Sequence, residues 1–106
     1  MLQVATVSVE LIHLLRPLVE RIRRRDRSLA DQLVRAANSI ALNIAEADRS
    51  EGGNVRSRFY SAAGSASETR MALGVAVAWG YVSAQAAEEA DDHLDRVIAM
   101  LWQLTH

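Results

Sequence analysis

The sequence predicts an all-α protein, an up-down-up-down four-helix bundle that forms a single domain over residues 1–106. Three observations predict this fold. Apolar residues recur every three or four positions in four successive segments, as they do along one face of a helix. Proline occurs once and glycine five times, and turn-forming residues separate the four segments. No segment alternates apolar and polar residues as a half-buried strand does, and short turns make successive helices antiparallel.

The first two helices are predicted from apolar stripes separated by a run of arginines. Pro17 lies inside the first stripe and has no amide hydrogen for the helix ladder, so it is expected to bend or break that helix. Ser28, with Asp31 three residues later, forms a variant of the capping box and is expected to open the second helix. The predicted inner positions are Val4, Val7, Leu11, Leu14, Leu18 and Ile22, then Leu29, Leu33, Ala36, Ile40, Asn43 and Ala47.

The third helix is predicted to follow a turn at residues 49–53. Asn54 is expected to cap its N-terminus and Gly80 to end it. Two glycines inside this helix, Gly64 and Gly74, each cost about 1 kcal/mol relative to alanine. We expect them to let a neighbouring helix approach closely. The predicted inner positions are Val55, Phe59, Ala62, Ala66, Thr69, Leu73 and Ala76.

The fourth helix is predicted to begin after Ser83, which is the residue type that caps helix N-termini. Its inner positions are expected to form one apolar seam against the other three helices. They are Ala87, Ala90, Leu94, Val97, Leu101 and Leu104.

Composition narrows the classes of protein to consider. Cysteine is absent, which excludes disulfides and thiolate chemistry. The first residues lack the basic start of a signal peptide and soon include Glu10 and His13. No run approaches the roughly 20 apolar residues that span a bilayer. We therefore expect a soluble, cytoplasmic protein that does not contact a membrane.

The most distinctive motifs are AANSIALNIAEA at residues 36–47 and FYSAAGSASE at residues 59–68. Together they resemble the signature of a bacterial four-helix-bundle family. This family includes proteins encoded in intervening sequences of large-subunit ribosomal RNA genes and the accessory variability determinant of diversity-generating retroelements. The resemblance covers residues 28–104 and implies a bundle that assembles into a homopentamer. For the retroelement member it also implies binding to a reverse transcriptase and to nucleic acid through a basic surface.

Polar residues of these motifs are expected to face one another between the second and third helices. Antiparallel packing about the turn near Gly53 sets the register of this polar ladder. The expected facing pairs are Glu46 with Arg58, Asn43 with Ser61, Ser39 with Ser65, and Arg35 with Glu68. Such a ladder fixes which residues of the two helices lie opposite each other and which helices pack together, as a buried Asn does in coiled coils. The alternative is that Glu46 and Glu68 are catalytic or metal-binding carboxylates, and we favour the structural role.

Catalytic constellations are not evident in the sequence. A di-iron bundle takes Glu-x-x-His from each of two helices, whereas Glu10 and His13 provide this spacing once and Glu89 and His93 stand four apart. No His or Gly-rich turn is placed to activate a serine, and no phosphate-binding loop is present. The sequence therefore predicts a protein that is not an enzyme and that needs no metal and no cofactor.

A cluster of arginines is the strongest candidate for a binding site. Clustered guanidinium groups attract phosphate and release its counterions, so the cluster predicts nucleic-acid binding. The alternative is that these arginines pair with the acidic start of the fourth helix, within one subunit or across an interface. The cluster is Arg16, Arg21, Arg23, Arg24, Arg25 and Arg27, and the acids are Glu88, Glu89, Asp91, Asp92 and Asp95.

Apolar side chains beside the seam of the fourth helix predict a second contact surface. Ile98, Met100 and Trp102 surround its last turns, and Trp79 precedes the helix together with Tyr81 and Val82. An excess of exposed apolar surface marks a partner interface. We expect this interface to join identical chains in a symmetric homo-oligomer.

These observations favour a non-enzymatic oligomeric adaptor that binds nucleic acid, or a nucleic-acid enzyme such as a reverse transcriptase, through its arginine-rich surface. The alternative is a structural self-assembling bundle without nucleic-acid binding. A carboxylate-bridged metal enzyme is a distant third interpretation.

Overall fold

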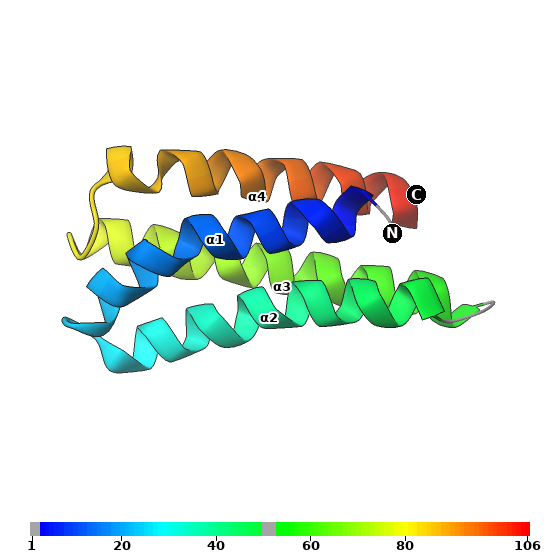
Figure 1. Cartoon of the computed structure of the whole chain (residues 1–106), viewed down its shortest axis with the longest axis horizontal. Helices are drawn as coiled ribbons and strands as arrows, with labels where there is room; N and C mark the ends of the chain where they lie inside the picture. Colours follow the sequence, from blue (N-terminus) through cyan, green and yellow to red (C-terminus); the bar gives the residue numbers. More distant parts are fainter. Residues whose placement is uncertain (1–2, 50–52) are drawn as a thin grey trace.

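The computed structural model describes residues 3–49 and 53–106. They form four helices: α1 (Gln3–Arg23), α2 (Arg27–Arg49), α3 (Gly53–Ala78) and α4 (Ala84–Thr105). Successive helices run in opposite directions (Figure 1), and no strand occurs among the described residues. The predicted all-α four-helix bundle is therefore confirmed.

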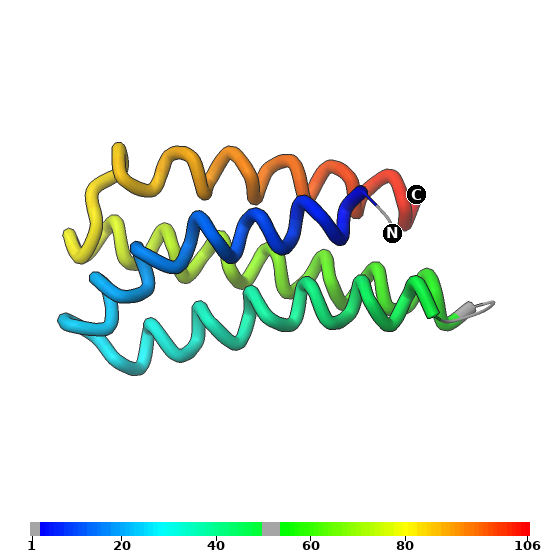
Figure 2. Tube along the Cα trace, viewed as in Figure 1, coloured from blue at the N-terminus to red at the C-terminus, as the bar shows by residue number. Residues whose placement is uncertain are grey.

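The bundle is a rod of 43 × 22 × 20 Å in which each helix packs against two neighbours. Helix α1 contacts α2 and α4, and α3 contacts the same two helices from the opposite side. The α1–α2 and α3–α4 turns lie together at one end of the rod. The start of α1 and the end of α4 lie at the other end (Figure 2). Within the described residues, no helix combines the length and apolar character needed to cross a bilayer.

Two inner positions of α1 and α2 differ from the prediction by one residue. Leu15 is buried and Leu14 is only half-buried. Likewise Ile44 is fully buried, whereas Asn43 is half-buried. A helical period of 3.6 permits either neighbour to face inward, and burying the apolar Ile44 avoids the cost of desolvating the Asn43 amide.

Pro17 does not end α1, which continues to Arg23. Proline leaves one carbonyl without its intrahelical donor, here that of His13 one turn earlier. Both residues are exposed, so water can hydrogen-bond to this carbonyl and the helix continues.

The residue that caps α2 differs from the prediction. Asp26, not Ser28, accepts the backbone N–H of Leu29 through Oδ1 at 3.0 Å, and the helix begins at Arg27. An aspartate caps more strongly here because its negative charge also favours the positive end of the helix dipole. Helix α3 begins at Gly53, so Asn54 lies inside its first turn, and the position that caps it is outside the described residues.

Both predicted signals at the α3–α4 turn are confirmed. Gly80 has a φ of 76°, a left-handed conformation that glycine adopts without steric cost. The N–H of Tyr81 bonds the carbonyl of Ala76, and that of Gly80 bonds Val77, both at 2.9 Å, which is the pattern of a Schellman cap. Ser83 then caps α4 by accepting the N–H of Ala86 at 3.0 Å.

The last turn of α4 also departs from the predicted seam. Thr105 is buried and donates through Oγ1 to the carbonyl of Leu101 at 3.0 Å, whereas Leu104 is 42% exposed. The hydroxyl of Thr105 can be buried because its own helix supplies the acceptor. Val55 of α3 is half-buried for a simpler reason, since it lies in the first turn of its helix.

The expectation that Gly64 and Gly74 admit a neighbouring helix is wrong within this chain. Both are exposed, and a methyl group added at either would meet no atom within 4 Å. We therefore expect Gly64→Ala and Gly74→Ala each to stabilise the fold by about 0.5–1 kcal/mol, because alanine restricts the unfolded chain and favours the helix. Chemical denaturation measures this change, and destabilisation by either substitution would show that another surface covers the glycine.

Candidate functional site

The two turns at one end of the rod are joined by a contact between residues far apart in sequence. The Tyr81 hydroxyl donates to Oδ2 of Asp26 at 3.3 Å, and the Arg25 guanidinium lies 5.5 Å from the Tyr81 ring centroid, within cation–π range. Burial, followed by the charge of Asp26, raises the pKa of Tyr81. Asp26 therefore both caps α2 and anchors the α3–α4 turn. The sequence did not predict this contact, because no local pattern pairs residues 55 positions apart.

Two arginines of the predicted cluster are neutralised by acids. Arg16 pairs with Glu20 of its own helix at 3.7 Å, and Arg23 bridges α1 to Asp31 of α2 at 2.5 Å. The hydrogen bond from Arg23 lowers the pKa of Asp31. These two guanidinium groups are therefore less available to an external anion than the rest of the cluster.

The remaining arginines form what we call the arginine end: Arg21, Arg24, Arg25 and Arg27. All four are exposed. Among residues 3–49 and 53–106, none of them forms an ion pair within 4.0 Å. They occupy the last turn of α1, the α1–α2 turn and the first residue of α2.

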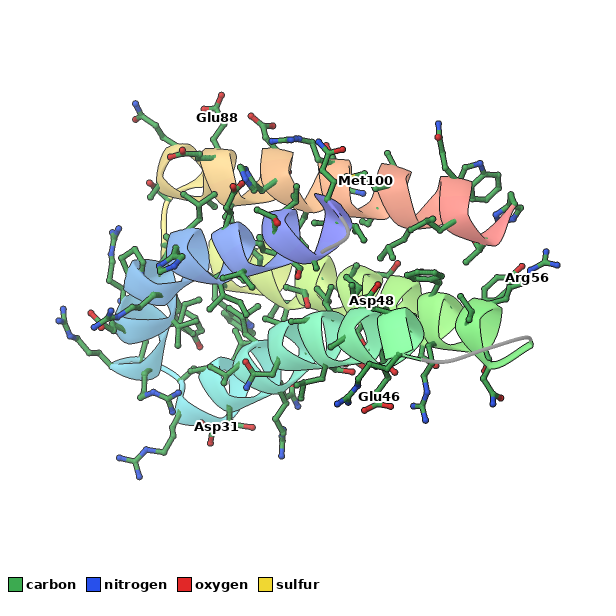
Figure 3. All side chains as sticks on the ribbon, turned by 45° about the vertical axis from the view of Figure 1, so that its right-hand side comes forward. Asp31, Glu46, Asp48, Arg56, Glu88 and Met100 are labelled. Carbon is green, nitrogen blue, oxygen red and sulfur yellow. The ribbon has the colours of Figure 1, made fainter. Side chains whose placement is uncertain are left out.

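The acidic start of α4 does not neutralise the arginine end by direct pairing. In the described part of the chain, Asp95 pairs with Arg70 of α3, and Glu88, Glu89, Asp91 and Asp92 form no ion pair. Figure 3 shows Glu88 projecting outward from α4. The predicted pairing of the two charge clusters within one subunit is therefore not found.

The lowered pKa of Asp31 gives a pH-dependent prediction. The ion pair with Arg23 stabilises the fold above the ordinary carboxyl value of 3.8 and loses this effect as the pH falls through the lowered pKa. We expect Asp31→Asn to lower the melting temperature slightly at neutral pH and not at about pH 2. Thermal unfolding at both pH values tests this. An equal loss at both would mean that the substitution acts through something other than charge.

The polar ladder between α2 and α3 forms only at its centre. Ser65 of α3 donates to Oγ of Ser39 at 2.8 Å, the pair that the antiparallel register placed opposite. Asn43 does not bond Ser61, which is exposed. Instead its Nδ2 donates back to the carbonyl of Ser39 at 2.9 Å and to its Oγ at 3.0 Å. Asn43 therefore satisfies its amide within α2.

The two expected ion pairs at the ends of the ladder are not formed. Glu46 pairs with Arg49, one turn along α2, and the described residues include no Glu46–Arg58 ion pair. Figure 3 shows Glu46 on the outer side of its helix. Arg35 and Glu68 line the same shallow groove between α2 and α3 but form no ion pair within 4.0 Å in this part of the chain. A local partner on the same helix suits exposed charges better, since long-range pairing orders two side chains for little gain.

Carboxylates and imidazoles do not gather into a metal centre in the described residues, where no group of three such ligands occurs. Glu10 of α1 instead contacts Nε2 of His93 of α4 at 3.1 Å. This contact ties the two helices together across the side of the bundle.

The four predicted interface residues do not form one surface. Trp79 and Trp102 are 69% and 61% exposed, but Trp79 follows the end of α3 and Trp102 lies in the last turn of α4, so they are at opposite ends of the rod. Ile98 and Met100 are partly buried against the core, and Val82, expected to be exposed, is buried. Trp102 stacks on His106 with ring centroids 3.5 Å apart. Trp79 belongs to the same end of the rod as the arginines.

Comparisons with known proteins agree with this fold. A family model described as 23S rRNA-intervening sequence protein matches residues 1–103. A crystal structure of a protein of unknown function from the S23 ribosomal protein family of Bacteroides thetaiotaomicron superposes with a TM-score of 0.86 at 19% identity, covering 96% of this chain and 97% of that one. At this identity the likeness concerns the fold alone. No curated protein is significantly similar to the chain.

Proposed function

The chain belongs to the family of 23S rRNA-intervening sequence proteins, and we propose that it is a non-enzymatic, self-associating adaptor that binds the phosphate backbone of nucleic acid through its arginine end. The observation that carries this proposal is the set of exposed arginines at one end of the rod without ion pairs among the described residues.

Arginine suits this role because its planar guanidinium donates two parallel hydrogen bonds to a phosphate. Each phosphate that is neutralised releases counterions, which supplies affinity without base recognition. The family's name refers to ribosomal RNA, which makes RNA the first nucleic acid to test. A reverse transcriptase as partner would rest on the resemblance to the retroelement accessory protein alone.

A binding role rather than a catalytic one is supported by how the bundle uses its buried polar groups. Among the described residues these are Ser8, Thr69 and Thr105. Each donates its hydroxyl to a backbone carbonyl of its own helix, at 2.7, 2.7 and 3.0 Å respectively. These hydroxyls complete the helices and are not aimed at a shared cavity.

Fluorescence anisotropy of a labelled RNA oligonucleotide tests the proposal. At low salt we expect saturable binding, and the logarithm of the affinity should fall linearly with the logarithm of the salt concentration, by about 0.7 per contact on a single strand. Failure of any RNA or DNA to bind at low salt would overturn the proposal.

Self-association is proposed through the end of α4, where Trp102 and Leu104 are exposed on different sides of the helix. Leu104 and the half-buried Met100 line a groove of about 310 Å³ between this end and α1. Trp102→Glu is expected to lower the mass measured by light scattering from several times 11.7 kDa towards that of one chain, because it places a charge in an apolar contact. The pentamer implied by the family resemblance is the proposed assembly.

Trp79→Glu is the matched control for this experiment, since it makes the same change at an equally exposed tryptophan on the other end of the rod. Its mass should equal that of the wild type. A wild-type monomer at micromolar concentration would contradict self-association, and an equal mass for the Trp102→Glu variant would contradict this surface.

A structural assembly without nucleic-acid binding is the second candidate. The observation that favours it is that Glu88, Glu89 and Asp92 are exposed and form no ion pair among the described residues. These acids would then pair with the arginine end of another copy. In that case substitution of the arginines would dissociate the oligomer, and no oligonucleotide would bind.

A further inference from the structure

We propose that the arginine end holds single-stranded nucleic acid and that Trp79 stacks on one of its unpaired bases. This inference rests on the proposed function and names the class of nucleic acid that the same site would take. It follows from the position of Trp79, whose indole is exposed in the turn that contacts the arginine end through Tyr81.

Trp79 and the arginine end are brought together by the contact between the two turns. Arg25 lies over the Tyr81 ring, and Tyr81 donates to Asp26. Trp79 is two residues from Tyr81, and Arg24 and Arg27 flank Arg25 and Asp26. The two turns that carry these aromatic and cationic residues therefore come from separate halves of the chain and lie at the same end of the rod (Figure 1).

The backbone that carries Trp79 is fixed on both sides. Its N–H continues the last turn of α3 by bonding the carbonyl of Val75 at 3.0 Å. Gly80 then ends the helix in a left-handed conformation, and Val82 inserts into the core. The indole is thus presented on an ordered support, which lowers the entropy that stacking would cost.

The packing of the core does not require a tryptophan side chain at position 79. Its side chain is 69% exposed, while Val82 and Tyr81 fill the space beneath the turn. An exposed aromatic ring at the same end of the rod as exposed arginines matches the chemistry of single-strand binding, in which guanidinium groups follow the backbone and aromatic faces stack on bases. Bases in a duplex are already stacked on one another, so a duplex offers this ring no comparable face.

The experiment compares three ligands of equal length: a single-stranded RNA, a strand of the same backbone without bases, and a duplex. Trp79→Ala is expected to weaken binding of the single-stranded RNA by about 5- to 150-fold and to leave binding of the abasic strand unchanged. Met71→Ala removes an equally exposed apolar side chain of α3 outside both the arginine end and the proposed self-association surface. It is the matched control and should bind all three ligands like the wild type. The chain contains two tryptophans, so Trp102→Phe leaves Trp79 as the sole tryptophan reporter, and its emission should be quenched by the RNA but not by the abasic strand.

The outcomes separate the two proposals. Binding of all ligands with equal affinity by the wild type and by Trp79→Ala would overturn base stacking and leave phosphate binding in place. Tighter binding of the duplex than of the single strand would also overturn the inference. If none of the ligands binds at low salt, both this inference and the proposed function are wrong.

Discussion

Replacing Arg21, Arg24 and Arg27 with glutamine is expected to remove most of the affinity of the protein for nucleic acid and most of its dependence on salt. Each substitution deletes one exposed guanidinium that has no ion pair among the described residues. Because three phosphates would no longer be neutralised, the slope of log affinity against log salt should fall by about 2 for a single strand. The advantage of the wild type over the variant should then shrink by about 20-fold between about 50 and about 200 mM salt.

A triple variant at Arg56, Arg58 and Arg96 is the matched control, because it makes the same charge change away from the arginine end, at arginines that also form no ion pair among the described residues. Its affinity should stay near that of the wild type, apart from a small long-range effect at low salt. Equal reductions of affinity in the two triple variants would mean that net charge, and not this end of the rod, governs binding. Arg23 and Arg25 are left intact because Arg23 pairs with Asp31 and Arg25 covers Tyr81.

Leu94→Ala is expected to destabilise the bundle by about 2–5 kcal/mol. Leu94 lies midway along α4 and is fully buried in the core shared by all four helices. The destabilisation combines the transfer free energy of the deleted groups with a cavity that packed neighbours fill only partly. Because a domain of this size is stable by roughly 5–15 kcal/mol, the change should be a large part of the total. Urea denaturation measures it.

Leu42→Ala is the control for this prediction, since Leu42 is 66% exposed on α2. Its free energy of unfolding should change by no more than about 0.5 kcal/mol. A destabilisation comparable to that of Leu94→Ala would show that Leu42 is covered, which would place α2 in a contact between copies.

The helices could be predicted well because the spacing of apolar residues indicates which side of a helix is buried, and glycine indicates where a helix ends. Gly80 and Ser83 were identified from residue type, since their roles are local. The errors occurred where two neighbouring residues compete for one role. Asp26 caps α2 in place of Ser28, and Leu15 is buried in place of Leu14. Only the packing of the other helices decides between such neighbours.

The candidate site was only partly predictable. Residue type identified the arginines, but not which of them pair with acids, because Arg23 reaches Asp31 across a turn. The expected pair of Glu46 and Arg58 was wrong because Arg49 offered a closer partner. The turn that carries Trp79 contacts the arginine end through the hydrogen bond from Tyr81 to Asp26, which no sequence pattern indicates.

Backbone amide chemical shifts recorded during titration with a single-stranded RNA show where the ligand binds on the protein. We expect the changes to gather at residues 20–28 and 78–83, where the two turns meet. We expect little change at residues 56–60 and 100–105, at the opposite end of the rod. Changes gathered at that opposite end, or spread evenly along all four helices, would contradict the assignment of nucleic-acid binding to the arginine end.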